Sequence, residues 1–240
     1  MSITDNVWSS VGVHTGGTWP KTFWIGLEGI GGAGKTTQLE RLSRALREQY
    51  PDRVVATDGE FGDSPLGAYV SGATGDGRLR LAFLGGADTC VDTGHVRHLL
   101  ALAARAEKLR RAARRSWHVM LLDAGTAVDV AHALADIPPA AGPVRRWLRE
   151  AVESLLAPAA EAIGPGVTAF LECRPELAAE RLAGRLLRRP TAAEVTFLRR
   201  LADAYEEVLA GKDHVIRVDA EPPAEEVTAQ LLTALKPLLG

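Results

Sequence analysis

Five short runs of apolar residues recur along the chain, and within each run the apolar positions are largely consecutive rather than alternating with polar ones. A strand that is buried on both faces has this pattern, because neither of its faces meets water. Each run therefore predicts a short buried strand. The runs are residues 23–27, 53–57, 117–122, 167–171 and 215–218.

Between these runs the apolar residues recur every three or four positions, as they do on one face of a helix. In residues 36–50, for example, Leu39, Leu42 and Leu46 share one face, and charged residues fill the positions between them. Strands that alternate with helices form a parallel sheet with helices on both faces. We therefore predict an α/β fold with a five-stranded parallel sheet. The predicted helices are residues 36–50, 96–115, 143–163, 176–187, 192–210 and 223–238.

Two segments fall outside this alternation. Residues 1–21 are a polar lead-in without periodicity, and we expect an N-terminal extension, ordered only in part, before a single domain over residues 22–240. Residues 67–93 contain many glycines and only a short apolar patch. This second segment is either a mobile connection or a part of the chain that covers a substrate.

The composition narrows the classes of protein to which the chain can belong. Its 240 residues are 46% apolar, which is enough for the core of one α/β domain, and its formal net charge is −2. This charge gives no sign of nucleic-acid or membrane binding. No apolar run approaches the ~18 residues of a membrane span, and the two cysteines, Cys90 and Cys173, lie far apart. We expect a soluble, cytoplasmic protein without disulfides.

The strand predicted at residues 23–27 leads into the sequence GIGGAGKT, which matches the phosphate-loop pattern G-x-x-x-x-G-K-[ST]. Its glycines allow backbone N–H groups and the start of the next helix to point at phosphate oxygens. Lys35 would reach the β- and γ-phosphates, and the Thr36 hydroxyl would bind Mg²⁺. We therefore predict a nucleoside-triphosphate site. Its predicted phosphate-binding residues are Gly29, Gly31, Gly32, Ala33, Gly34, Lys35, Thr36 and Thr37.

Acidic residues follow two of the predicted strands. Asp123 ends the run 117–122, and ligands of an open α/β sheet bind outside the carboxyl ends of its strands. Asp123 would hold Mg²⁺ directly or through water, or accept the proton of an attacking hydroxyl; alternatively, it caps the next helix. Asp58 and Glu60 follow the run 53–57 at the same edge. They either face the acceptor or belong to an ordinary polar loop.

Arginines cluster within residues 181–189, next to Pro190. Their spacing would put Arg181, Arg185 and Arg188 on one face of a helix. Such a face is either solvated or, in a phosphoryl-transfer enzyme, neutralises charge on the transferred group. The histidines and cysteines have no spacing typical of a zinc site, and the sequence contains no Ser-His-Asp signature.

Together these segments resemble the bacterial-type thymidylate kinases, which are nucleoside monophosphate kinases. Residues 27–38 resemble that family's first strand and phosphate loop, and residues 60–67 resemble its E-P-G-G-T-P-L-G segment. Residues 100–106 resemble its helix L-F-A-A-D-R-A, and Asp123 falls where the family has D-R-Y. The arginine cluster at residues 181–189 occupies the position of the family's lid.

The resemblance spans residues 23–235 and implies a three-layer P-loop fold with an arginine-bearing lid at about residues 181–191. It also implies a phosphotransferase that uses ATP and Mg²⁺ and forms a homodimer. The site residues that it implies are the catalytic Lys35, Asp123, Arg185 and Arg188, the ATP-binding Arg181, the Mg²⁺ ligands Thr36 and Asp123, and the acceptor-binding Asp58, Glu60 and Arg105.

The chain departs from that family on the side that binds the acceptor. Gly31 replaces an acid of the phosphate loop that holds the sugar 3′-hydroxyl, and Gly59 replaces the arginine before E-P-G-G. Ala124 and Gly125 replace the arginine and tyrosine of D-R-Y, and Ala104 replaces the acid of the L-F-A-A-D-R-A helix. Each lost charge-assisted contact is worth about 1.5–3 kcal/mol. These departures point to an altered acceptor.

The sequence therefore leaves several acceptors open. dTMP, another nucleoside monophosphate, a nucleoside and another small hydroxyl compound all fit a kinase with this donor side. The alternative is a nucleotide-binding regulatory subunit or degenerate paralogue without kinase turnover. A GTPase or ATPase switch is more distant, because the chain has no N-K-x-D guanine signature and no residues that position a water can be located in the sequence.

Overall fold

The computed structural model describes residues 23–57, 103–104, 106–111, 118–123, 125, 127–163, 166–185 and 187–239. One or two helices follow β1, β3, β4 and β5 along these residues, as the apolar runs predict. The strands are β1 (Phe23–Glu28), β2 (Val55–Thr57), β3 (Val119–Leu122), β4 (Gly166–Glu172) and β5 (Val215–Asp219). The helices are α2 (Lys35–Gln49), α5 (Val128–Asp136), α6 (Gly142–Ile163), α7 (Pro175–Arg185), α8 (Ala192–Leu209) and α9 (Ala224–Leu239).

β1 is the central strand of the sheet that the described residues form, which has the order β2-β3-β1-β4-β5. All pairings between neighbouring strands are parallel, so the predicted five-stranded parallel sheet is confirmed. Every residue of β1 is buried, because β3 and β4 pair with its two edges and helices cover both faces of the sheet. Parallel strands end at the same edge of a sheet, so the segments that follow β1 and β3 are neighbours.

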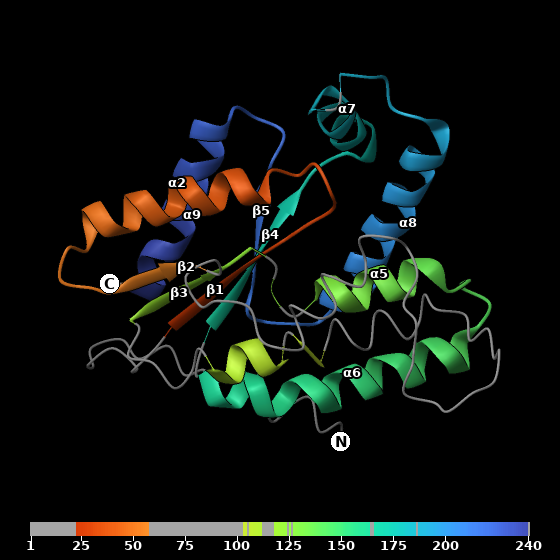
Figure 1. The fold of residues 1–240 in the computed structure, drawn as a ribbon, viewed down its shortest axis with the longest axis horizontal. Helices are drawn as coiled ribbons and strands as arrows, with labels where there is room; N and C mark the ends of the chain where they lie inside the picture. Colours follow the sequence, from red (N-terminus) through yellow and green to blue (C-terminus); the bar gives the residue numbers. More distant parts are fainter. Residues whose placement is uncertain are drawn as a thin grey trace, which may run out of the picture.

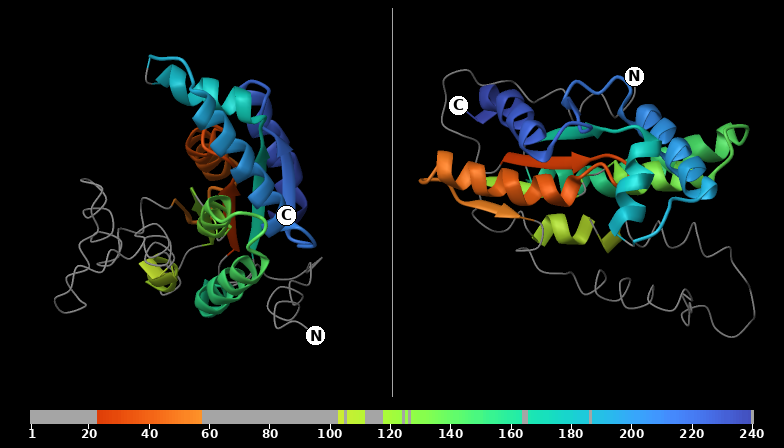
Figure 2. Two further views of the ribbon diagram at one scale, coloured as in Figure 1. Left: turned by 90° about the vertical axis from the view of Figure 1, so that its right-hand side faces the viewer. Right: turned by 90° about the horizontal axis from the view of Figure 1, so that it is seen from above.

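Helices cover both faces of the sheet, which gives the predicted three-layer fold (Figure 1). α2 and α9 pack together on one face, whereas α5 and α6 lie on the other face, with α8 against α5 (Figures 1 and 2). α7 lies beyond the carboxyl end of β4 (Figure 1). Among the described residues, no helix is long and apolar enough to cross a membrane.

α5 is a helix that the apolar pattern does not predict. Its nine residues, VDVAHALAD, carry alanines where the predicted helices carry leucines, so the periodic signal is weak. Ala131, Ala133 and Leu134 are nevertheless completely buried, because α5 packs against α6 and α8. The helix therefore owes its stability to tertiary packing rather than to a strong local signal.

One close contact between β1 and β4 fixes the core around the central strand. The Trp24 side chain is 1% exposed, and its indole ring lies directly beside the backbone of Gly166, the first residue of β4. A Cβ atom at Gly166 would lie 2.1 Å from the ring atom Cδ2. Glycine is required at this position because any side chain would occupy the space of the indole.

We predict that Gly166→Ala lowers the free energy of unfolding by about 1–3 kcal/mol, because the added methyl group must displace the buried Trp24 ring. The control is Gly184→Ala in α7, where a Cβ atom meets nothing within 4 Å. This control should raise the free energy of unfolding by about 0.5 kcal/mol. Thermal unfolding followed by circular dichroism measures both changes. An unchanged midpoint of thermal unfolding for G166A would contradict the close contact between the Trp24 ring and the backbone of Gly166.

Candidate active site

The phosphate loop (residues 29–36) leaves the carboxyl end of β1 and runs into the first turn of α2. Three of its glycines have backbone angles that L side chains rarely adopt, with φ of 141° at Gly29, 88° at Gly32 and 95° at Gly34. A Cβ atom at Gly32 would lie 2.3 Å from the carbonyl oxygen of Ala178. The loop is therefore pressed against α7, and its shape depends on these glycines.

The start of α2 is open to an anion. Gly34 is the N-cap residue, and it has no side chain that could accept a hydrogen bond from the first turn of the helix. The N–H groups of a helix N-terminus carry partial positive charge and bind phosphate when they have no other acceptor. The predicted phosphate-binding residues, including Ala33 and Thr37, are all described and lie in this loop and the first turn of α2.

Lys35 lies over the phosphate loop rather than in solvent. Its Nζ donates hydrogen bonds to the carbonyl oxygens of Gly29 and Ile30, at 2.7 and 3.2 Å. Burial lowers the pKa of Lys35 below its ordinary value, and the carboxylates of Glu28 and Asp123 oppose that shift. The ammonium group is thus held by neutral acceptors at the centre of the loop, where a phosphate would offer a stronger partner.

Thr36 and Asp123, the two predicted Mg²⁺ ligands, lie side by side. The Thr36 Oγ1 atom is 3.4 Å from both carboxylate oxygens of Asp123, although the two residues are 87 positions apart in sequence. Asp123 is the first residue after β3, and β3 pairs with β1. A hydroxyl and a carboxylate are oxygen donors of the kind that Mg²⁺ prefers. This pair therefore fits a magnesium ion beside the phosphate loop.

A buried carboxylate that the sequence did not single out lies behind the phosphate loop. Glu28, the last residue of β1, is completely buried, and its Oε1 atom accepts a 2.8 Å hydrogen bond from the Ala127 N–H. Its Oε2 atom accepts a hydrogen bond from the Tyr205 hydroxyl at 3.1 Å. The one sequence signal for this site is an acid at the end of an apolar run, directly before the phosphate loop.

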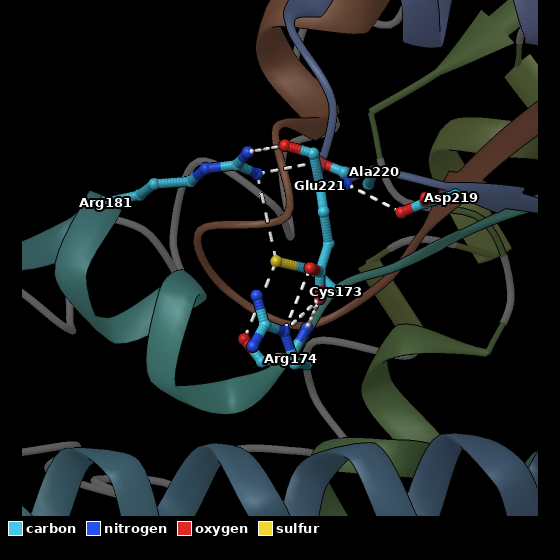
Figure 3. A network of polar contacts seen from close by, with 6 residues as sticks. All are labelled: Cys173, Arg174, Arg181, Asp219, Ala220 and Glu221. Atoms are coloured by element: carbon cyan, nitrogen blue, oxygen red, sulfur yellow. Dashed lines mark hydrogen bonds and ion pairs between the residues drawn. The ribbon is translucent and has the colours of Figure 1, made fainter.

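Arg181 connects α7 to the turn that follows β5 (Figure 3). Its guanidinium group donates hydrogen bonds to the carbonyl oxygens of Ala220 and Glu221, both at 2.8 Å. The Glu221 carboxylate in turn accepts a 2.8 Å hydrogen bond from Arg174, which precedes α7. Burial raises the pKa of the neighbouring Cys173 thiol, which therefore stays protonated at neutral pH. Arg181 thus restrains α7 against the end of the sheet.

The prediction that three arginines share one helix face is wrong for Arg188. α7 ends at Arg185, and Leu187 then takes a left-handed conformation with φ of 53°, so the chain turns before it reaches Arg188. Arg188 forms an ion pair with Glu194 through both guanidinium nitrogens, one of them at 2.8 Å. Arg185 makes no hydrogen bond or ion pair within the described residues.

Glu194 has a second role at the start of α8. Its carboxylate accepts hydrogen bonds from the N–H and hydroxyl groups of Thr191, which completes a capping box. The hydrogen bonds from Arg188 and Thr191 lower the pKa of Glu194 to about 2. Because its pKa lies below the ordinary value, this carboxylate stays charged at neutral pH and loses its contacts only when the pH falls toward 2.

The described residues include only part of the side of the site that is predicted to bind the acceptor. Asp58, Glu60 and Arg105, predicted to bind the acceptor, lie outside the described residues. At Gly31 a Cβ atom would lie 3.4 Å from Leu182 Cδ1 and 3.9 Å from Leu198 Cδ2. At Gly125 a Cβ atom would lie 2.6 Å from Glu28 Oε1. Two positions that depart from the resembled family thus face apolar side chains and a buried carboxylate.

The fold and this site define a class of protein, the P-loop nucleotide-binding phosphotransferases. The defining features are a phosphate loop after the central strand, a lysine (Lys35) that lies over this loop, and the Thr36 hydroxyl beside the Asp123 carboxylate at the carboxyl edge of a parallel sheet. Within that class the sequence matches the Thymidylate kinase family model over residues 27–231. The chain therefore belongs to the thymidylate kinase family, and it is an ATP-dependent phosphotransferase.

Known relatives agree over most of the chain. It is 30% identical over 224 residues to the thymidylate kinase of Paracidovorax citrulli, covering 89% of this chain and 92% of that protein. It is 31% identical to the thymidylate kinase of Verminephrobacter eiseniae, covering 88% and 90% of the two chains. The thymidylate kinase of Deinococcus radiodurans is 30% identical, with 88% of this chain and 95% of that protein covered.

We predict that Gly32→Ala weakens ATP binding at least about tenfold, because a methyl group at this position meets the Ala178 carbonyl and also requires a left-handed backbone. Gly34→Ala is the matched comparison, since its φ is also positive but its Cβ atom meets nothing within 4 Å. The loss for G34A should be smaller. Isothermal titration calorimetry with ATP measures both, and equal affinities for G32A and the unaltered protein would contradict the close packing on α7.

Proposed function

We propose that this protein transfers the γ-phosphoryl group of ATP to a nucleoside monophosphate, with dTMP as the first candidate. The observation that carries the proposal is the geometry around the phosphate loop, where Lys35 lies over the loop and Thr36 lies beside Asp123. The relatives named above are thymidylate kinases, and they match the chain over nearly its whole length. This supports dTMP as acceptor.

Each polar residue of the donor side has a role in this proposal. The loop N–H groups and Lys35 bind the β- and γ-phosphates, and Lys35 exchanges two carbonyl oxygens for phosphate oxygens. Thr36 and Asp123 hold Mg²⁺, which neutralises charge on the phosphate oxygens when it is bound. In this proposal Asp123 also orients the acceptor hydroxyl or phosphate.

The arginines of residues 181–189 stabilise the transferred group in this proposal. Arg185 is the most available of them, since it is exposed and has no acceptor among the described residues. Arg188 contributes only after it leaves the Glu194 carboxylate. Arg181 shapes the ATP site by holding the turn after β5 against α7. Asp58, Glu60 and Arg105 remain the proposed acceptor-binding residues.

A second acceptor class is favoured by the surroundings of Gly31 and Gly125. In the resembled family an acid at the first position grips the sugar hydroxyl, whereas here that direction faces Leu182 and Leu198. An uncharged acceptor such as a nucleoside needs fewer cations than a monophosphate does. The missing arginines at positions 59 and 124 point the same way.

The protein is proposed to be a cytoplasmic homodimer. Trp147 and Val144 lie on α6 with 59% and 49% of their surfaces exposed, and large apolar side chains of this kind are common at subunit contacts. Cys173 is a free thiol, which is consistent with a reducing compartment.

Light scattering measures the molar mass of the protein in solution. We expect the mass of two chains, and a mass of one chain at micromolar concentration would contradict the dimer.

We predict that dTMP supports ADP formation from ATP and that Lys35→Ala lowers the rate about 100-fold or more, because the variant lacks the cation that contacts the transferred group. Lys236→Ala is the matched control, since it removes an exposed lysine at the far end of α9. Its rate should equal that of the unaltered protein. A coupled assay for ADP measures each rate with dTMP and with thymidine.

The same assay, repeated with a set of nucleosides and nucleotides, distinguishes a monophosphate acceptor, an uncharged acceptor and a protein that binds ATP without turnover. Turnover with thymidine but not with dTMP would favour the uncharged acceptor. ATP binding without ADP formation for any nucleoside or nucleotide would favour a binding protein without turnover. Full activity of K35A would contradict the assigned role of the phosphate loop.

A further inference from the structure

We propose that Glu28 is a positioning residue that holds the segment carrying Asp123 beside the phosphate loop, through hydrogen bonds to α5 and α8. The inference rests on the Mg²⁺-binding role proposed for Asp123. It assigns a function to a buried carboxylate that has no proposed contact with ATP. Three features of the described residues carry it: the burial of Glu28, the missing cap of α5 and the close passage of Gly125.

The first feature is the burial of a charged group. Glu28 is completely buried at the end of β1, next to the phosphate loop. A buried carboxylate lowers stability unless hydrogen bonds and charges compensate the loss of water, so Glu28 requires polar partners in the core. Its two oxygens accept hydrogen bonds from different elements, at 2.8 Å from the Ala127 N–H and at 3.1 Å from the Tyr205 hydroxyl. Glu28 thus joins three parts of the fold.

The second feature is that α5 has no cap of its own. Its N-cap residue, Ala127, cannot accept a hydrogen bond through its side chain, and helices usually begin with a residue that can. Glu28 supplies a carboxylate at that end of α5 from 99 residues away in sequence. Negative charge at a helix N-terminus stabilises the helix. The position of the α5 N-terminus is therefore tied to the end of β1.

The third feature is the path between Asp123 and α5. Gly125 passes so close to Glu28 that a Cβ atom would lie 2.6 Å from Oε1. Asp123 lies two residues before this contact and Ala127 lies two residues after it, so Glu28 contacts the chain at two points that follow Asp123 closely. The carboxylate of Glu28 thereby limits how far Asp123 can move from Thr36.

Tyr205 fixes the other oxygen of Glu28. It is completely buried in α8, and its ring packs on Phe170 of β4 with 5.4 Å between the ring centroids. Burial, followed by the charge of Glu28, raises the pKa of Tyr205 well above its ordinary value. The hydroxyl is therefore protonated at neutral pH and acts as a donor. A rigid aromatic group thus holds the carboxylate in one orientation.

The test is the gain in ATP affinity that Mg²⁺ provides, measured by titration calorimetry with Mg²⁺ and with a chelator. We expect Tyr205→Phe and Glu28→Gln to reduce this gain about tenfold, as loss of an outer-shell partner does at metal sites. Asp123→Asn should remove the gain. ATP affinity in the chelator should stay unchanged in Y205F, because the loop and Lys35 are intact.

The control is Val208→Ala, which trims a buried side chain one turn further along α8 without touching Glu28. V208A should lower the unfolding midpoint and keep the full Mg²⁺ gain. The proposal is overturned if Y205F and E28Q both keep the full gain, or if V208A loses as much of it as they do. It is also overturned if the unaltered protein binds ATP equally well with and without Mg²⁺. Failure to bind ATP at all would instead contradict the proposed function.

Discussion

The donor site depends on a central strand that cannot shift. β1 is buried along its whole length and pairs with β3 on one edge and β4 on the other, so a slip of one residue would disturb both pairings. The position of Gly29, which directly follows β1, is therefore fixed relative to the sheet. β3 runs beside it at about 4.8 Å and ends at the same edge. The contact between Thr36 and Asp123 follows from this arrangement.

The cations around this site have internal partners of different strength. Lys35 donates to neutral carbonyl oxygens, and a phosphate is a stronger acceptor for an ammonium group. Arg188 instead pairs with the charged Glu194, which also caps α8. Arg185 has no such competitor among the described residues. We therefore expect Lys35 and Arg185 to engage an incoming polyphosphate more readily than Arg188 does.

Much of the fold and the donor site follows from local sequence patterns. Consecutive apolar residues predict the strands, and the glycine spacing between a strand and a helix predicts the phosphate loop. Asp123 is predictable because parallel strands end at one edge of a sheet. The resemblance to the thymidylate kinases adds the family, which the match over residues 27–231 confirms.

The rest depends on contacts that sequence spacing does not encode. α5 is rich in alanine and its cap comes from Glu28, so its own residues carry little signal. The left-handed conformation of Leu187 removes Arg188 from the helix face that its spacing suggests. Tyr205 meets Glu28 across 177 residues of sequence. Long-range polar contacts of this kind become visible only when the packing is known.

The most direct test of the account is whether a phosphoryl group reaches an acceptor. The protein is incubated with ATP, Mg²⁺ and a pool of nucleosides and mononucleotides, and the masses of all components are followed by mass spectrometry. We predict that one acceptor gains the mass of a phosphoryl group while an equal amount of ADP forms. ADP that appears only with inorganic phosphate, or no ADP at all, would contradict it.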